Sequence, residues 1–268
     1  MKTRQPPALI DVGANLTHDS FDADRDAVIA RAREAGVSRM IVTGADLAHS
    51  RAATALVETH PGVLYASAGV HPHLAGDFSP EVARELADLL THPAVVAAGE
   101  CGLDYFRDFS PREMQREAFA AQIALAIAAN KPLFLHQRDA HDDFLALLDR
   151  FSDRLPKTLV HCFTGRAGEL DAYLERGFYI GITGWVCDER RGAHLPALLG
   201  RIPAGRLMLE TDAPYLLPRD LIPKPATRRN EPCWLPHIAT VVARARGENL
   251  EELAAHTTAA ARAFFDIA

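Results

Sequence analysis

Short apolar runs alternate with amphipathic segments along most of the chain. Two of the runs end in histidine, in the sequences Leu-Phe-Leu-His136 and Thr-Leu-Val-His161. Between them, the segment from Ala140 to Phe151 carries apolar residues near helical spacing. A short apolar run, a helix and a second apolar run predict a parallel βαβ unit. Each histidine is therefore expected at the carboxyl end of a buried strand, where parallel α/β proteins place functional side chains.

The same alternation predicts strands and helices over nearly the whole sequence. Besides the two runs that end at His136 and His161, strands are expected at Ala8–Val12, Arg39–Thr43, Val63–Val70, Ala94–Gly99, Phe178–Ile182 and Arg206–Glu210. Helices are expected at Asp22–Ala35, Asp46–His60, Ser79–Leu90, Ser110–Asn130, Ala140–Phe151, Arg166–Arg176 and Arg191–Leu199. Ser79 and Ser110 each precede a proline, which is typical of a helix N-cap and first helical position.

This order of elements predicts an α/β protein, a single-domain (β/α)8 TIM barrel over residues 1–268. The competing fold is a doubly wound sheet, which would carry a G-x-G-x-x-G turn after its first strand. The sequence Asp11-Val-Gly-Ala-Asn-Leu does not match that turn, so the barrel is favoured.

Composition narrows the class of protein. The chain has 268 residues, 48% of them hydrophobic and 24% charged, as in ordinary soluble globular proteins. Its net charge of −6 argues against a general electrostatic attraction to nucleic acid, so such binding needs a local basic patch. Four cysteines without a C-x-x-C pair indicate free thiols in a reducing compartment. The polar segment Met1–Pro7 lacks the apolar region of a signal peptide, and we expect a cytoplasmic protein.

The predicted barrel brings five polar residues to one rim, because each follows a predicted strand. They are His71, Glu100, His136, His161 and Asp212. A divalent ion with nitrogen and oxygen ligands accounts for histidines and carboxylates that converge on one point. Structural roles remain open for some of them: Asp212 as a turn cap, Glu100 as an ion-pair partner and His71 as a pocket wall. His73 is expected to be solvated.

Six blocks of sequence carry a resemblance to a known family. They are Gly-Val-His71-Pro-His, Gly99-Glu-Cys-Gly-Leu-Asp104-Tyr, Pro-Leu-Phe-Leu-His136-Gln-Arg-Asp-Ala, His161-Cys-Phe-Thr-Gly, Gly-Trp185-Val-Cys-Asp-Glu-Arg-Arg-Gly and Glu210-Thr-Asp-Ala-Pro-Tyr. Together they resemble the TatD family of metal-dependent deoxyribonucleases over essentially the whole chain. The resemblance implies a TIM-barrel metallohydrolase of the amidohydrolase superfamily, with 3′–5′ exonuclease activity on DNA or RNA. It also implies magnesium dependence and a cytoplasmic role in repair of oxidised DNA.

One block departs from the wider family, which usually carries His-x-His after its first strand. Gly13 and Asn15 occupy those positions here. The remaining metal ligands, Glu100, His136 and His161 with Asp212, are expected to hold one ion well and a second weakly. Two imidazoles favour Zn²⁺ or Mn²⁺ on ligand grounds, whereas the resemblance implies Mg²⁺. We expect Mg²⁺, with Mn²⁺ or Zn²⁺ as the alternative.

Phosphodiester hydrolysis assigns roles to these residues. Asp212 is the expected proton acceptor, and Glu100 and His71 complete the catalytic set. Side chains that could bind phosphate are His71, Arg138, Arg190, Arg191 and the basic loop residues Lys224, Arg228 and Arg229. Trp185 and Tyr105 are candidates for stacking on bases. A solvated basic loop without ligand is the plain alternative.

Three classes of function remain open at this point. The first is a metal-dependent nuclease, expected to be monomeric and to act on DNA or RNA. The second is an ester or amide hydrolase such as a D-aminoacyl-tRNA deacylase, because the same activated water attacks carbonyl groups. The third is a non-catalytic barrel that binds nucleic acid through its rim.

Overall fold

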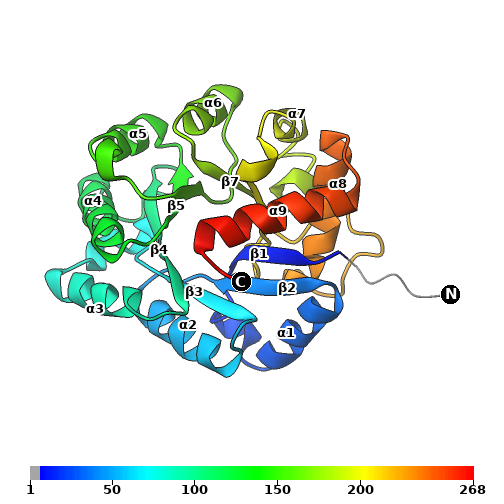
Figure 1. Ribbon diagram of the computed structural model, residues 1–268, viewed down its shortest axis with the longest axis horizontal. Coiled ribbons are helices and arrows are strands. Elements are labelled where there is room, and N and C mark those ends of the chain that lie inside the picture. The colour runs from blue at the N-terminus through cyan, green and yellow to red at the C-terminus, as the bar shows by residue number, and fades with distance from the viewer. Residues whose placement is uncertain (1–6) are drawn as a thin grey trace.

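The computed structural model describes residues 7–268, which form one eight-stranded parallel sheet surrounded by helices (Figure 1). Each strand pairs with its neighbours in sequence, in the order β1 to β8. A doubly wound sheet would reverse its strand order partway, so the predicted (β/α)8 barrel in a single domain is confirmed. The Met1–Pro7 segment, on which the signal-peptide argument rested, lies outside the described residues except for Pro7.

Strands and helices alternate through most of the described chain. The strands are β1 Leu9–Ala14, β2 Val37–Val42, β3 Leu64–Ala68, β4 Val95–Asp104, β5 Leu133–Arg138, β6 Thr158–Val160, β7 Tyr179–Ile182 and β8 Leu207–Leu209. The α-helices are α1 Arg25–Glu34, α2 Leu47–Thr59, α3 Pro80–Leu90, α4 Arg112–Ala129, α5 His141–Asp149, α6 Ala167–Glu175, α7 Pro196–Leu199, α8 Leu235–Arg246 and α9 Leu250–Phe265. Short 3-10 helices are η1 Asp19–Phe21, η2 Pro72–Asp77, η3 Ser152–Arg154, η4 Gly184–Cys187, η5 Ala204–Arg206 and η6 Pro232–Trp234.

The barrel closes between β1 and β8 at their carboxyl ends. Asp212 N donates to Gly13 O at 2.8 Å, and Asn15 N donates to Ala213 O at 2.7 Å. The buried carboxylate of Asp11 reinforces this seam, because it accepts hydrogen bonds from Thr211 N at 2.9 Å and from Thr211 Oγ1 at 2.5 Å. The closure therefore places the ends of the first and last strands side by side.

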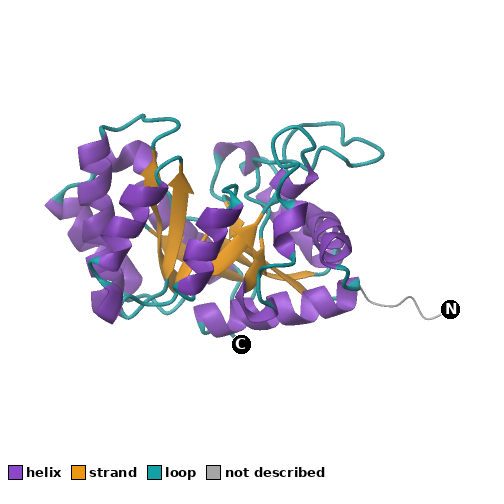
Figure 2. Ribbon diagram, turned by 90° about the horizontal axis from the view of Figure 1, so that it is seen from above, coloured by secondary structure: helices purple, strands orange, loops and turns teal. Residues whose placement is uncertain are grey.

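The opposite end of the barrel is closed by α9. Its side chains Ala260, Phe264 and Phe265 belong to the same buried cluster as Ile10 of β1 and Phe134 of β5. This cluster fills the barrel interior, while the larger apolar core lies between the strands and the outer helices. In Figure 2 the C-terminus lies at the bottom and the long loops lie at the top. Because α9 covers the amino-terminal end, the open end of the barrel is the one formed by the carboxyl ends of the strands, where barrel enzymes place their active sites. Within residues 7–268, no helix is long and apolar enough to cross a membrane.

Several predicted boundaries are wrong. Glu100 and His136 lie within β4 and β5 rather than after them, because all of β4 through Asp104 is buried and pairs with β5. Ser110 does not cap α4: its hydroxyl donates to His73 O at 2.8 Å and accepts from Gly76 N at 3.2 Å.

The helix predicted at Arg191–Leu199 is reduced to the four residues of α7. The Asp188 carboxylate accepts hydrogen bonds from the backbone N–H groups of Arg190 and Arg191, which holds these residues in a turn. Helices α8 and α9 were not predicted at all, although the buried residues Leu235, Ile238, Ala239, Val242 and Ala243 follow helical spacing.

Candidate metal centre

Three imidazole nitrogens surround one carboxylate oxygen at the carboxyl end of the barrel. Glu100 Oε1 lies 2.8 Å from His161 Nε2, 3.2 Å from His136 Nδ1 and 3.4 Å from His71 Nε2. Glu100 lies in β4 and His136 in β5, whereas His161 directly follows β6 and His71 directly precedes η2. Both His161 and Glu100 are buried, so the group lies at the bottom of the site rather than on the surface. The structure thus brings together four of the five residues predicted to share this rim.

Two further carboxylates support the histidines from behind. Asp104 Oδ2 lies 3.2 Å from His136 Nε2, and Glu210 Oε2 lies 3.3 Å from His161 Nδ1. A carboxylate on the far nitrogen fixes the orientation of a histidine and raises its basicity, as is typical behind metal ligands. Sequence reasoning missed these roles, although both residues stand in the blocks quoted above.

Charges are strongly coupled within this group. Burial opposes ionisation of Glu100, but the neighbouring His161 and His71 outweigh it and hold the pKa of the carboxyl well below its usual range. Burial likewise opposes the charged form of His161, yet Glu100 and Glu210 raise the pKa of its imidazole well above the usual value. The Glu100 carboxylate therefore needs positive charge beside it, which protons on imidazole or a divalent cation can provide.

The donor set fits a divalent cation. His161 Nε2 is buried and faces Glu100 Oε1, but the two atoms lack the alignment of a hydrogen bond. The second imidazole donor of the set, His136 Nδ1, lies 3.2 Å from the same Glu100 oxygen. Nitrogen and carboxylate oxygen that converge without a hydrogen bond are suited to sharing an ion, and no thiolate takes part.

His71 differs from the other two histidines. Its Nδ1 accepts the backbone N–H of His73 at 3.1 Å, so the neutral ring carries its proton on Nε2. Burial lowers the pKa of His71 to about 4, which keeps the ring neutral. A protonated Nε2 is a hydrogen-bond donor and not a ligand, which suits the predicted contact of His71 with substrate better than a place on the metal.

Asp212 lies beside the cluster, where the chain leaves β8. Burial raises the pKa of its carboxyl to about 7, opposed by the positive charge of His161. Asn15 Nδ2 donates to Asp212 Oδ1 at 3.0 Å, and the Asp212 backbone has a left-handed φ of 56°. Such backbone strain persists only where surrounding contacts enforce it. The structure thus orients this carboxylate, which leaves it one oxygen for chemistry.

Gly13 explains how the site differs from the family's usual pattern. A Cβ at this position would lie 2.6 Å from Glu210 Oε2 and 3.2 Å from Phe134 Cζ. The Glu210 carboxylate fills the space that a side chain at position 13 would need, and from there it reaches His161. At the second departing position, Asn15 contacts Asp212. The two positions therefore support other site residues instead of supplying ligands of their own.

Arginine and aromatic side chains form a row along the rim. The Arg138 guanidinium lies 3.9 Å from the centroid of the Phe106 ring and 5.8 Å from that of Trp185. Arg191 lies 4.3 Å from the Trp185 ring, and its Nε is 2.9 Å from Asp188 Oδ2. We call Phe106, Arg138, Trp185 and Arg191 the arginine–aromatic row; Phe106 was not predicted, and 53% of its surface is exposed.

Three further side chains considered in the sequence analysis pair with carboxylates of the protein itself. Arg190 Nε lies 3.6 Å from Asp188 Oδ1, so this charge is partly neutralised. The Tyr105 hydroxyl donates to Asp143 at 2.6 Å, and the Arg112 guanidinium occupies one face of its ring, so that face is not free for a base. His73 is not simply solvated, because its Nε2 lies 2.8 Å from Asp104 Oδ2.

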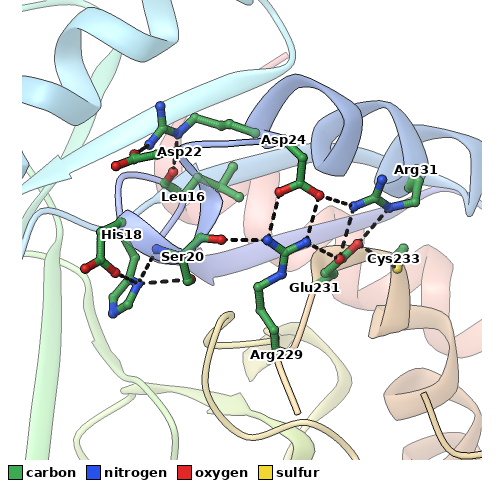
Figure 3. Close-up of polar contacts among 11 residues, drawn as sticks. Leu16, His18, Ser20, Asp22, Asp24, Arg31, Arg229, Glu231 and Cys233 are labelled. Atoms are coloured by element: carbon green, nitrogen blue, oxygen red, sulfur yellow. Dashed lines mark hydrogen bonds and ion pairs between the residues drawn. The ribbon is translucent and has the colours of Figure 1, made fainter. Parts of the chain in front are cut away.

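The basic loop separates into free and paired residues. Lys224 and Arg228 are exposed and have no hydrogen-bond or ion-pair partner among the described residues. Arg229, by contrast, bonds to both oxygens of Asp24 and to Glu231, each at 2.8 Å (Figure 3). The positive charge of Arg229 is therefore largely neutralised by these two carboxylates.

A cavity of about 500 Å³ opens next to the site. Its walls come from the last residues of β5 and β6, from the segments that follow these strands and from the start of α6. Arg138 and Arg166 supply positive charge to it, and Glu169 supplies negative charge. The cavity extends the row of rim residues toward α6.

Known proteins resemble this chain over nearly all of its described length. A family model described as TatD related DNase matches residues 10–266. A protein named 3′-5′ ssDNA/RNA exonuclease TatD from Cronobacter turicensis is 56% identical over 257 residues, which cover 96% of this chain and 97% of that protein. The protein of the same name from Edwardsiella piscicida is 54% identical over 260 residues, covering 97% and 100%. The solved structure of YJJV, a TatD homologue from Escherichia coli, matches with a TM-score of 0.88 and 28% identity over 97% of this chain and 98% of that chain.

A parallel barrel whose strand ends collect histidines and carboxylates around one point defines a metal-dependent hydrolase of the TIM-barrel type. With the family model matching nearly every described residue, the assignment becomes specific. The chain belongs to the TatD family of DNases. The resemblance seen in the sequence blocks is confirmed.

Proposed function

We propose that this protein is a metal-dependent 3′–5′ exonuclease that hydrolyses phosphodiester bonds of single-stranded DNA and of RNA. One observation carries the proposal: the cluster around Glu100 at the carboxyl end of a TatD-family barrel. Polarity and the single-stranded substrate follow the names of the relatives at 50–56% identity. These names favour a nuclease over a deacylase or a non-catalytic barrel. A role in DNA repair or turnover in the cytoplasm, as a monomer, belongs to the same proposal.

Glu100, His136 and His161 would hold one divalent ion, which we propose to be Mg²⁺, with Mn²⁺ or Zn²⁺ as the alternative. Asp212 is the fourth candidate ligand. When bound, the ion supplies positive charge that activates water and neutralises the phosphoryl oxygens. Asp104 and Glu210 hold the two imidazoles in place through their far nitrogens.

Asp212 accepts the proton of the attacking water in this proposal. Its oxygen that is not bonded to Asn15 is available, and its raised pKa suits a general base near neutral pH. His71 faces the same site with a proton on Nε2, and it donates a hydrogen bond to a phosphate oxygen.

The substrate strand would follow the rim of the barrel. The exposed Phe106 ring and the Trp185 ring offer stacking surfaces, while Arg138 and Arg191 bring positive charge between them. Arg190, Lys224 and Arg228 extend the positive charge, and Arg229 contributes through the fold of the loop. Alternating aromatic and basic groups suit a single strand, whose bases are accessible.

The test uses metal-stripped protein and single-stranded DNA labelled separately at its 5′ and 3′ ends. Individual divalent ions are then restored. We expect activity to return with Mg²⁺ or Mn²⁺, and a 5′ label to remain on a ladder of shortening fragments. Immediate release of the 5′-labelled nucleotide would reverse the polarity, and absence of cleavage with every ion would refute the nuclease.

A further inference from the structure

A second group of potential metal ligands lies outside the Glu100 site. Cys187, Asp220 and His237 each offer a donor atom within 4.8 Å of the other two. Asp220 Oδ1 lies 2.7 Å from His237 Nε2. None of these three residues belongs to the cluster around Glu100, and the sequence analysis gave them no role in a site.

The group joins three segments that are separate in sequence. Cys187 ends η4, Asp220 lies in the irregular loop between β8 and η6, and His237 lies in the first turn of α8. Helix α8 packs against η4 and lies beside α7 in Figure 1. A bond to all three residues would fasten the loop that carries Tyr215, Lys224 and Arg228 to the body of the barrel.

Burial and charge favour a cation here. Cys187 is buried, whereas the side chains of Asp220 and His237 are 44% and 30% exposed, so the group has a protein side and a solvent side. The neighbouring Arg219 faces Asp188 and Glu189, at 3.6 and 3.5 Å. Within residues 7–268, no arginine or lysine therefore pairs with Asp220.

We propose that Cys187, Asp220 and His237 bind one Zn²⁺ ion, with solvent completing the coordination. Sulfur, nitrogen and carboxylate oxygen together match zinc and not magnesium. On binding, the Cys187 thiol gives its proton to solvent as the sulfur–zinc bond forms, and no electron is transferred. The ion stabilises the rim loop and takes no part in hydrolysis.

Cobalt spectroscopy tests this site without any assay of activity. Metal-stripped full-length protein is titrated with Co²⁺, and thiolate-to-cobalt charge-transfer absorption is recorded in the near ultraviolet. We expect the band in the parent protein and in a Cys233→Ser control, and its loss in Cys187→Ser. His237→Asn, a change at a partly exposed position, serves as a second variant and should weaken Co²⁺ binding at this site at least tenfold.

Two outcomes would overturn the proposal. One is the absence of the band in the folded parent protein. The other is a band that survives in Cys187→Ser and disappears in Cys162→Ser, which would assign the thiolate to the neighbourhood of the Glu100 site. Equilibrium dialysis with Zn²⁺ adds a count: at a free Zn²⁺ concentration that just fills the parent, Cys187→Ser should bind one ion fewer than the parent, and an equal count would contradict the site. Because none of these measurements uses DNA cleavage, they stand independently of the proposed nuclease.

Discussion

The carboxyl group of Glu100 is buried and that of Asp212 is partly buried, and their surroundings shift the two pKa values in opposite directions. Glu100 is surrounded by imidazoles and stays ionised, while Asp212 accepts a hydrogen bond from the neutral Asn15 amide and its removal from water favours the neutral form. Two carboxyl groups with pKa values driven apart commonly divide the work of binding and proton transfer. This division supports Glu100 as a ligand and Asp212 as the base.

Replacing Asp212 by asparagine should therefore separate chemistry from folding. The amide can still accept the hydrogen bond from Asn15, so we expect a melting temperature within a few degrees of the parent. Turnover should fall by about 10²–10⁴-fold, because the amide cannot accept a proton. Steady-state kinetics and thermal unfolding check both parts, and parent-like turnover in this variant would exclude Asp212 as the base.

A Gly13→Ala substitution should weaken metal binding through Glu210. The added methyl group meets Glu210 Oε2 and forces it away from His161 Nδ1. Loss of such a supporting carboxylate typically costs about 10–100-fold in metal affinity. We expect the Mg²⁺ concentration for half-maximal activity to rise by this factor, with a smaller change at saturating Mg²⁺.

Gly168→Ala is the matched control for this prediction, because nothing lies within 4 Å of an added Cβ at that position. Glu210→Gln should reproduce the effect of Gly13→Ala. If Gly13→Ala binds Mg²⁺ like the parent, Glu210 does not support the metal centre.

At the scale of the elements, the loop between β8 and η6 holds two kinds of basic residue. Neutralising the unpaired ones, in Lys224→Gln with Arg228→Gln, should weaken binding of single-stranded DNA. Each lost phosphate contact should reduce the slope of log K against log salt by about 0.7. Turnover at saturating substrate should change little, because contacts far from the reacting phosphate bind ground and transition states alike.

Arg229→Gln is the comparison for the loop. It should lower the melting temperature, since it removes one of the two arginines that pair with both Asp24 and Glu231 and leaves Arg31 as the other. An unchanged salt slope in the Lys224 and Arg228 double variant would direct attention to the arginine–aromatic row instead.

The sequence predicts its elements unevenly, for physical reasons. Apolar runs revealed the strands, because parallel strands are buried on both faces. The apolar run predicted the end of β4 wrongly, because the strand continues through Glu100 and Asp104. These carboxylates are buried by pairing with histidines, which a pattern of apolar residues cannot show. The pairing of Arg229 with Asp24 joins residues far apart in sequence, and only the closed barrel brings them together.

At the scale of the whole molecule, ion pairs join the start of the chain to the loop after β8, on the side of the barrel where β8 meets β1. Arg31 and Asp24, from α1 and the residue before it, meet Arg229 and Glu231 of the loop after β8 (Figure 3). Hydrogen bonds from Arg229 and Arg31 hold the pKa of Asp24 well below its usual range. Burial opposes the ionised form of Glu231, but hydrogen bonds from the same two arginines lower the pKa of this carboxyl too.

These shifts predict how stability depends on pH. A carboxyl whose pKa is lower in the folded state stabilises the fold above its unfolded pKa, about 4 for Asp and Glu, and loses this effect as pH falls further. The melting temperature of Asp24→Asn should therefore lie below that of the parent at pH 7, and the difference should shrink steadily below about pH 4. Thermal unfolding of both proteins from pH 7 to pH 2 measures this. Asp26→Asn, a change at an exposed position two residues away in the first turn of α1, should show no such convergence. A gap between parent and Asp24→Asn that stays constant to pH 2 would mean that packing around residue 24, rather than its charge, stabilises the seam between the first and last parts of the chain.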